Sequence, residues 1–381
     1  MVRQIAAAPL ADRRHRRPRH DRHRHEPRPH RPQGLTACES AVRVLRRPRS
    51  VLRVTPRAVA GTPRHRAAKR AVLTGVTVFQ IPARLAGTAR HDPEVARWIE
   101  DLPEIVAGLS ERWSLRVQAP FQPGGDGSWA APATRLSSSG GLVLKIGFPF
   151  ATGEHRDEAA ALRIWDGDGA VRLHEALTTQ TAHALLLERC VPGTKLRDAM
   201  PEPEQDVVIA RMLGRLWARA SAARSNGAWP FRTLTHMCDE WADQFTRDYA
   251  AAGPAEQIDP GLARDGIALF RELPRTATDS VLLCTDLHFE NILAAQREPW
   301  LVIDPKPYVG DPAYDVLQHL INCHERLAAD PGGLTDRMAS LAGLDASRVR
   351  LWLFARAVRE SVGFAVRAPL MRRVAPVLAP G

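Results

Sequence analysis

The sequence lacks the features of a membrane-anchored, exported or disulfide-bonded protein. It has no run of 18 apolar residues, the length that a transmembrane helix requires. Its first residues include no apolar core like that of a secretory signal peptide, so we expect no Sec export. Only five cysteines occur in 381 residues, and no two form a CxxC pair. Such scattered cysteines argue against a disulfide framework or a zinc finger and predict a reducing, cytoplasmic location.

Acidic residues are scarce only at the start of the chain. Residues 1–75 hold 20 Lys and Arg against four acids, a net charge of +16, so the rest of the chain carries −5 of the total of +11. The Arg, His and Pro of this segment follow no helical or strand period and cannot bury enough apolar surface to offset their ordering entropy. We expect a disordered basic extension. Three hypotheses stay open for it: a basic arm for nucleic acid, a tail without function, and, as the preferred one, a start codon set upstream of a true start near Val76.

Beyond this extension the pattern changes from short strands to long helices. Asp92 is a suitable N-cap for a helix with one apolar stripe that ends at Trp113. Alternating apolar residues between turns then predict a β-rich region, with a single helix over residues 154–165 inside it. The expected strands cover 115–119, 128–136, 142–148, 170–177 and 183–190. Helical spacing follows over 204–223, 234–250, 261–273, 312–327 and 346–367, with two short apolar strands between the third and fourth of these helices.

The sequence therefore predicts an α+β protein with two lobes. The N-lobe, residues 76–190, is a small antiparallel β-rich domain, and the C-lobe, residues 191–381, is larger and mainly α-helical. A cleft between two lobes is a usual place for a ligand.

The clearest chemical signal is a polar loop after an apolar strand. Asp286 and Asn291 have the D-x-x-x-x-N spacing of a phosphotransferase catalytic loop, in which the Asp receives the proton of an attacking hydroxyl and the Asn binds a metal ion. Asp304 ends the next apolar strand, where a second oxygen ligand for magnesium belongs. Each residue alone is commonplace, since loop Asp and turn Asn residues are frequent, and it is their order along the chain that indicates chemistry.

A lysine in an apolar strand precedes this loop. Lys145 lies in the middle of LVLKIGF, where it needs either solvent or an anion. Glu158 on the following helix is the expected partner, with Glu154 as the alternative, and such a pair orients the amine toward nucleotide phosphates. A glycine turn at residues 123–127 precedes the lysine. It is either a phosphate-approaching loop or a simple hairpin turn.

Together these residues resemble the aminoglycoside/hydroxyurea resistance kinase family, and within it the streptomycin 6-phosphotransferases. The resemblance runs from about residue 76 to near the C-terminus. It is carried by VLKIGFP (143–149), LRIWDGDGAVRL (162–173), ALLLERCVPGTKLR (184–197), TDLHFENILA (285–294), PWLVIDPKPYVGDPAYD (299–315) and RVRLWLFARAV (348–358).

The resemblance implies a protein-kinase-like two-lobed fold and the use of ATP and Mg²⁺. It implies that Asp286 is the catalytic Asp, that Asn291 and Asp304 are the magnesium ligands, and that Lys145 binds phosphate with Glu158 as its partner. The hinge that would meet the adenine edge through its backbone includes Glu188, Cys190 and Val191. His288 matches the family's loop His as a structural hydrogen bonder, Asp311 is interpreted as a loop brace or helix cap, and Lys306 remains unassigned.

The acceptor implied by the resemblance is the 6-hydroxyl of streptomycin, with hydroxyurea or another aminocyclitol as alternatives. Because streptomycin carries two guanidinium groups, acidic residues should line its site. The candidates share one helix segment, HMCDEWADQF, and are Asp239, Glu240 and Asp243. A solvated helix face is the competing interpretation. We expect a small-molecule substrate, no nucleic-acid or membrane partner, and a monomer.

Two departures from the family pattern leave a second class of function open. Cys284-Thr285 stands where the family usually has His-Gly, and Pro307 stands where a Gly is usual. Both could stiffen or narrow the loop next to the metal site. The alternative is therefore a kinase-like module that binds nucleotide with weak or no transfer. A nucleic-acid-binding protein that depends on the basic extension is the further alternative.

Overall fold

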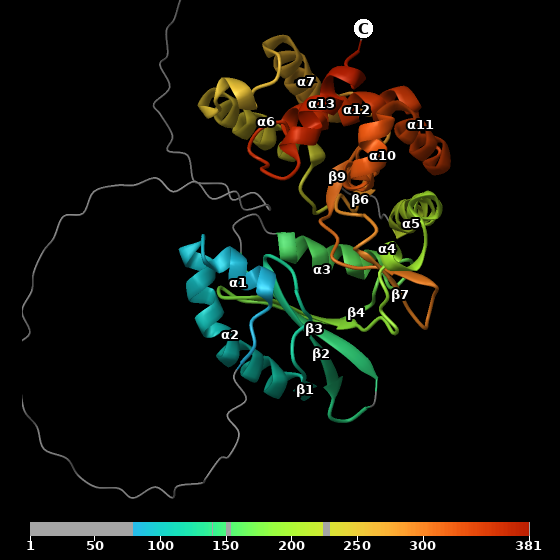
Figure 1. The fold of residues 1–381 in the computed structure, drawn as a ribbon. Helices are drawn as coiled ribbons and strands as arrows, with labels where there is room; N and C mark the ends of the chain where they lie inside the picture. Colours follow the sequence, from blue (N-terminus) through green and yellow to red (C-terminus); the bar gives the residue numbers. More distant parts are fainter. Residues whose placement is uncertain (1–78, 139, 150–153, 224–228, 381) are drawn as a thin grey trace, which may run out of the picture. The chain divides into compact units, whose positions relative to one another are not determined.

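The structure is a computed structural model that describes residues 79–138, 140–149, 154–223 and 229–380 (Figure 1). The expectations for residues 1–75 and for a start near Val76 lie outside these described residues. Within them, no helix has both the length and the apolar character needed to cross a membrane.

The first part of the described chain forms a five-stranded antiparallel sheet in the order β1-β2-β3-β5-β4 (Figure 1). Its strands are β1 (Leu115–Val117), β2 (Ser128–Arg135), β3 (Gly141–Gly147), β4 (Leu173–Thr178) and β5 (His183–Glu188). The first three strands are sequential neighbours, as the turn signals between them predict. Helix α3 (Glu154–Trp165) separates β3 from β4, and β5 pairs with both strands, so that β4 lies at the edge.

Helices cover both faces of this sheet. On one face lie α1 (Ala83–Ala89) and α2 (Pro93–Arg112), and the Asp92 side chain accepts hydrogen bonds from the first backbone N–H groups of α2, as predicted. Leu144 and Ile146 of β3 point into the core on this side. Because side chains alternate along a strand, Lys145 points to the opposite face, where α3 packs. The strand period therefore presents the lysine to the helix that carries Glu158.

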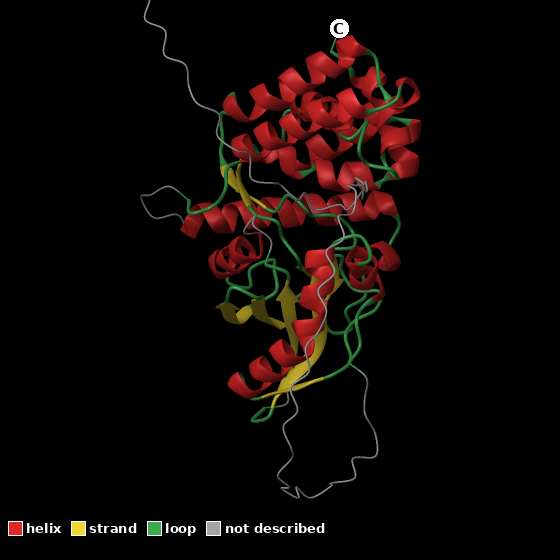
Figure 2. Ribbon diagram, turned by 90° about the vertical axis from the view of Figure 1, so that its left-hand side faces the viewer, coloured by secondary structure: helices red, strands yellow, loops and turns green. Residues whose placement is uncertain are grey.

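The remainder of the described chain is mainly helical (Figure 2). Its longer helices are α5 (Glu202–Ala223), α6 (Leu234–Ala251), α7 (Pro260–Glu272), α11 (Pro331–Ala342), α12 (Ala346–Arg359) and α13 (Ala368–Leu378). Its shorter ones are α4 (Leu196–Ala199), α8 (Pro312–Asp315), α9 (Leu317–Asn322), α10 (His324–Ala329) and the 3₁₀ turns η1 (Pro254–Glu256) and η2 (Leu273–Arg275).

Two sequence expectations for these helices were wrong in detail. The single helix expected over residues 312–327 is three short helices, and the break between α9 and α10 lies at Cys323, where the backbone leaves helical geometry with a ψ of 60°. The helix expected over 346–367 ends at Arg359, and Gly363 follows with a φ of +80°, a left-handed conformation that a continuing helix does not permit.

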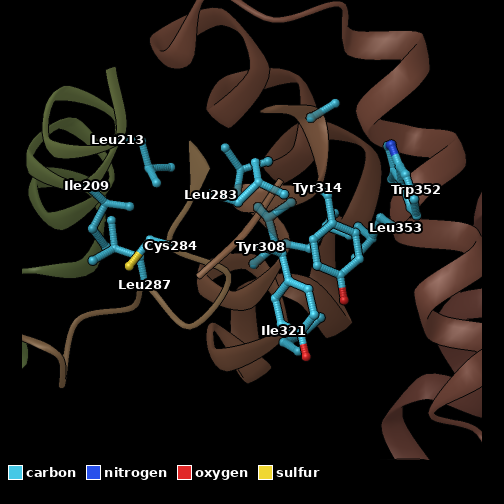
Figure 3. Close-up of a cluster of buried hydrophobic side chains, with 14 of the residues drawn as sticks. Ile209, Leu213, Leu283, Cys284, Leu287, Tyr308, Tyr314, Ile321, Trp352 and Leu353 are labelled. Carbon is cyan, nitrogen blue, oxygen red and sulfur yellow. The ribbon is translucent and has the colours of Figure 1, made fainter. Parts of the chain in front are cut away.

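A two-stranded antiparallel sheet and a hairpin hold the polar loop between strands and helices. β6 (Val281–Leu283) pairs with β9 (Tyr308–Gly310), and β7 (Ile292–Ala294) pairs with β8 (Trp300–Val302). Figure 3 shows Cys284 and Leu287 of this loop beside Ile209 and Leu213 of α5, and all four side chains are buried. Apolar packing of Cys284 and Leu287 therefore fixes one side of the loop. The polar residues between these two lie on the other side.

Candidate active site

A buried ion pair joins the sheet to helix α3. Lys145 Nζ lies 2.7 Å from each carboxylate oxygen of Glu158, and the two side chains are 8% and 1% exposed. The sequence interpretation had Glu158 as the preferred partner and Glu154 as the alternative. The structure brings Glu158 to the lysine, while the side chain of Glu154 lies outside the described set. The pair holds the lysine amine at a fixed position in a low-dielectric environment.

The same lysine reaches Asp304, which is 159 residues away in sequence. Lys145 Nζ lies 2.7 Å and Lys306 Nζ 2.5 Å from Asp304 Oδ1. Desolvation opposes ionisation of this carboxyl group, but the two ammonium groups outweigh it and hold the pKa of Asp304 well below its usual range. Asp304 is therefore an ionised oxygen donor at any physiological pH.

Asp286 and Asn291 face each other across a tight loop. The Asn291 side-chain nitrogen donates to the backbone oxygen of Asp286 at 2.9 Å and to its carboxylate at 3.3 Å. Asn291 directly precedes β7, and its backbone oxygen accepts a hydrogen bond from the N–H of Ile303, one residue before Asp304. The β7–β8 hairpin thus brings the two candidate metal ligands side by side at its open end.

Asp315 anchors the start of this loop, a role that the sequence analysis missed. Its carboxylate is fully buried and accepts from the backbone N–H of Cys284 at 3.0 Å, from that of Thr285 at 2.6 Å and from Trp217 Nε1 at 2.9 Å. Burial raises the pKa of Asp315 to about 6, although these hydrogen bonds favour the ionised form. The one sequence feature that could have indicated this role is that Asp315 lies in the mainly apolar segment after Gly310-Asp311-Pro312.

The departure at Thr285 has a specific structural consequence. Thr285 has a φ of +48°, in the left-handed region that favours glycine, which is the usual family residue at this position. Its hydroxyl donates to the backbone oxygen of Lys306, and the Lys306 N–H donates to the backbone oxygen of Cys284 at 2.9 Å. The threonine therefore keeps the glycine-like backbone and adds a link between the two polar loops.

His288 and Asp311 have structural positions. His288 Nδ1 accepts from the backbone N–H of Glu290 at 3.4 Å, and burial lowers the pKa of His288 to about 4, so the imidazole is neutral at pH 7. Asp311 is the N-cap of α8, which confirms that interpretation. Its carboxylate also accepts from Arg348 Nε at 2.5 Å and from Trp352 Nε1 at 2.7 Å.

The predicted hinge connects the sheet to the β7–β8 turn. Both oxygens of Glu188 accept hydrogen bonds from Arg297 at 2.9 Å, and one also accepts from the backbone N–H of Arg172 at 3.0 Å. Cys190 is buried, and burial raises the pKa of its thiol to about 12, so it stays protonated. Val191 is 39% exposed. The Glu188 side chain is thus committed to Arg297.

The glycine turn has a close packing contact of its own. Gly124 has a φ of +76°, and a Cβ placed there would lie 2.4 Å from Pro82 Cβ. Backbone geometry and packing on the chain before α1 therefore account for this glycine. The turn lies between β1 and β2, as the sequence predicts.

The acidic residues proposed for acceptor binding make ion pairs on the surface of α6. Asp239 lies 2.6 Å from Arg275 and 3.6 Å from Arg271, Asp243 lies 2.6 Å from Arg271, and Glu240 lies 3.1 Å from His236. Each of the three carboxylates therefore has an arginine or histidine partner within the protein.

A buried polar cluster lies behind the loop. Asp206 is fully buried and accepts hydrogen bonds from His319 Nε2 at 2.8 Å, Arg326 at 2.7 and 2.9 Å, and Arg337 at 2.8 Å. The His319 ring lies 6.0 Å from the ring of Phe289, in the polar loop. Asp206, His319 and Cys323 are close enough to hold a metal ion. Because two arginines already neutralise Asp206, we interpret this cluster as a structural ion-pair network.

Comparison with known proteins identifies the family of this chain. The profile of the aminoglycoside/hydroxyurea antibiotic resistance kinase family matches residues 123–367, more than half of the sequence. The chain belongs to this family. A resistance kinase of this kind is a phosphotransferase that acts on hydroxyl groups, which agrees with a site that combines a lysine, a loop Asp and two oxygen donors for a metal ion.

Two curated relatives of this resistance kinase have different acceptors. A hydroxyurea phosphotransferase of Kitasatospora aureofaciens is 35% identical over 286 residues, which cover 74% of this chain and 79% of that protein. A streptomycin 6-kinase of Streptomyces griseus is 30% identical over 318 residues, 79% of this chain and 97% of that protein.

A solved structure shares the fold of this resistance kinase. The amicoumacin kinase hAmiN, in complex with AMP-PNP, Ca²⁺ and Ami, has a TM-score of 0.50 at 13% identity and covers 72% of this chain and 94% of its own. The protein-kinase-like two-lobed fold that the sequence predicts is confirmed. The boundary between its lobes near Cys190 stays a prediction.

Proposed function

We propose that this resistance kinase transfers the γ-phosphoryl group of ATP to a hydroxyl group of a small antibiotic. The observation that carries the proposal is the meeting of three distant segments at Asp304. Lys145 of β3 touches its carboxylate, and Asn291, which hydrogen-bonds Asp286, is joined to the neighbouring Ile303 through the backbone. These contacts support the proposal because they bring together an amine that would bind phosphate, a carboxylate that would accept a proton and oxygen atoms that would bind a metal ion.

The residues present fit a magnesium ion. Magnesium prefers hard oxygen donors, and Asp304 offers an ionised carboxylate while Asn291 offers a carboxamide oxygen. The β7–β8 pairing, in which Ile292 faces Val302, fixes both residues at one end of the same hairpin. When bound there, the ion would neutralise charge on the nucleotide phosphates.

The remaining chemistry would come from the protein's own side chains. Lys145, held by Glu158, would bind the nucleotide phosphates. Asp286 would align the acceptor hydroxyl and receive its proton as the acceptor oxygen bonds to the γ-phosphorus and the bond from that phosphorus to the bridging oxygen of ADP breaks. Positioning and charge stabilisation supply most of the rate in such transfers. Backbone groups of Glu188 to Val191 would meet the adenine edge.

Streptomycin, through its 6-hydroxyl, is the acceptor that the sequence resemblance favours. Hydroxyurea is the second candidate, and two observations favour it. The hydroxyurea phosphotransferase relative has the higher identity, 35% against 30%. The three acids proposed to bind the guanidinium groups of streptomycin already pair with Arg271, Arg275 and His236. We further expect a cytoplasmic monomer, and the four described cysteines are buried thiols, which suits a reducing compartment.

An ADP-release assay with ATP and Mg²⁺ tests the proposal and separates the acceptors. The panel contains streptomycin, other aminoglycosides and hydroxyurea. Asp286→Asn is the test variant, and Asp101→Asn, the same change on an exposed position of α2, is the matched control. We expect acceptor-dependent turnover that falls at least about 100-fold in the Asp286 variant and is unchanged in the control.

Each outcome of this assay has a distinct meaning. Turnover with one acceptor names the substrate. Nucleotide binding without turnover for any acceptor would contradict the proposal and favour the nucleotide-binding module, with Thr285 and Pro307 as the residues to replace. Equal activity in Asp286→Asn and wild type would remove Asp286 from the mechanism.

A further inference from the structure

Lys306 occupies the space between the candidate metal ligand and the catalytic loop. Its ammonium group lies 2.5 Å from Asp304 Oδ1, and its side chain is 18% exposed. Its backbone is fixed to the loop of Asp286 at two points, because its N–H donates to Cys284 and its carbonyl accepts from the Thr285 hydroxyl. The side chain therefore extends from a rigid base toward the centre of the site.

Lys145 and Lys306 share one carboxylate oxygen of Asp304. Lys145 also touches both oxygens of buried Glu158 at 2.7 Å, which keeps its amine in place whatever happens at Asp304. A metal ion held by Asp304 would compete with the ammonium group of Lys306 for the carboxylate oxygen. A lysine has a flexible stem and a compact charge, so it can turn to a phosphate oxygen nearby.

The position of Lys306 decides which phosphate it would meet. The β- and γ-phosphates would lie at the metal ion held by Asp304 and Asn291, and the acceptor hydroxyl would lie at Asp286. The γ-phosphoryl group must therefore pass between Asp304 and Asp286. Lys306 follows Asp304 by two residues in the sequence, and its backbone is hydrogen-bonded to the start of the loop that carries Asp286.

We propose that Lys306 is a second phosphate-binding lysine that contacts the γ-phosphoryl oxygens and stabilises their charge during transfer. The inference rests on the proposed function. In the transfer, the acceptor oxygen bonds to the γ-phosphorus, the bond to the bridging oxygen breaks with its electron pair leaving on ADP, and the acceptor proton passes to Asp286. Lys306 forms no bond in this step and acts by its charge.

Binding of two nucleotides separates this role from a purely structural one. We would measure the Kd of AMP-PNP and of ADP, each with Mg²⁺, by calorimetry for wild type, Lys306→Met and Lys306→Arg. Arg135→Met serves as control, since Arg135 makes an exposed pair with Glu175 on the sheet. We expect Lys306→Met to raise the Kd of AMP-PNP about 10- to 100-fold, the range for the loss of one charged hydrogen bond. The Kd of ADP should change by less than about twofold.

The other results overturn the inference in recognisable ways. If Lys306 only balances the negative charge of Asp304, its loss changes the Kd of AMP-PNP and the Kd of ADP by a similar factor, because both nucleotides bind with the metal ion. Unchanged affinity for both would also overturn it. The Lys306→Arg variant, which keeps the charge, should recover most of the AMP-PNP affinity and so excludes misfolding as the cause. Wild-type protein that binds neither nucleotide would overturn the proposed function itself.

Discussion

Replacing Glu158 by glutamine tests whether the buried ion pair holds the Lys145 amine in place. Glutamine keeps the size of the side chain and removes its charge, so the ammonium group loses a partner that is 1% exposed. Removing one member of a buried pair costs about 3–5 kcal/mol. Because Asp304 Oδ1 stays 2.7 Å from the amine, we expect a smaller loss of about 2–3 kcal/mol in the free energy of unfolding.

The double variant Lys145→Met, Glu158→Leu separates stability from function. Replacing a buried ion pair by apolar side chains of similar volume is often neutral or stabilising, by about 1–4 kcal/mol. We therefore expect the double variant to be within about 1 kcal/mol of wild type in stability and to have no measurable transfer activity, because the amine proposed to bind phosphate is gone. Glu158→Gln should keep activity with a KM for ATP raised about 10-fold or more.

Urea unfolding and steady-state kinetics measure both effects on the same samples. Glu175→Gln is the matched control, since Glu175 makes an ion pair with Arg135 at 3.0 Å on the surface, with its own side chain 45% exposed. An exposed pair of this kind contributes about 0–1 kcal/mol. If Glu158→Gln were as stable as this control and had an unchanged KM for ATP, the reasoning about the buried pair would be refuted.

Three further predictions concern the catalytic loop and its surroundings. Asp315→Asn should lower kcat about 10- to 100-fold with little change in the KM for ATP, because the carboxylate positions the backbone just before Asp286, the proposed catalytic residue. His288→Gln should leave the pH profile of kcat unchanged between about pH 6 and 8, because burial lowers the pKa of His288 to about 4 and its imidazole is already neutral there. Asp206→Asn should destabilise the protein by about 2–4 kcal/mol at pH 7 and reduce the loss of stability on acidification. Burial raises the pKa of Asp206, but hydrogen bonds from His319 and two arginines outweigh it and hold that pKa well below the unfolded value. Its contribution is therefore present above about pH 4 and lost as the pH falls through the folded pKa.

Kinetic and unfolding measurements decide among these outcomes. A KM effect without a kcat effect in Asp315→Asn would contradict its positioning role. A new inflection in the pH profile of His288→Gln, or loss of an existing one, would show that this histidine titrates during turnover. Acid unfolding of Asp206→Asn that parallels wild type from about pH 5 to pH 2 would contradict the linkage argument.

Local patterns were sufficient for most of the secondary structure and for the polar loop. Helix α3 was predicted with the bounds that the structure has, and the DGDG that follows it marked its end. The predicted strand 128–136 is one residue longer than β2 at its end, and the predicted strand 142–148 is shifted by one residue from β3. The spacing of Asp286 and Asn291 sufficed to place them together, since five residues in a tight loop cannot separate two side chains far.

Long-range partners could not be obtained in the same way. Nothing in the sequence around Asp315 shows that Cys284, Thr285 and Trp217 converge on it, because that contact needs α5, α8 and the loop packed together. The order of β4 and β5 in the sheet likewise depends on the path of α3, which periodicity does not report.

The sequence by itself determined which residues this kinase could use, because an amine, a proton acceptor and oxygen ligands are properties of side chains and their spacing. Only the tertiary structure decided how they combine. It placed Lys145 and Lys306 on the same oxygen of Asp304, although 159 residues separate the first from it. It also committed the acids of α6 to nearby arginines and a histidine. Charges in a folded chain find whichever partners packing brings within a few ångströms, and that distance is set by the whole fold.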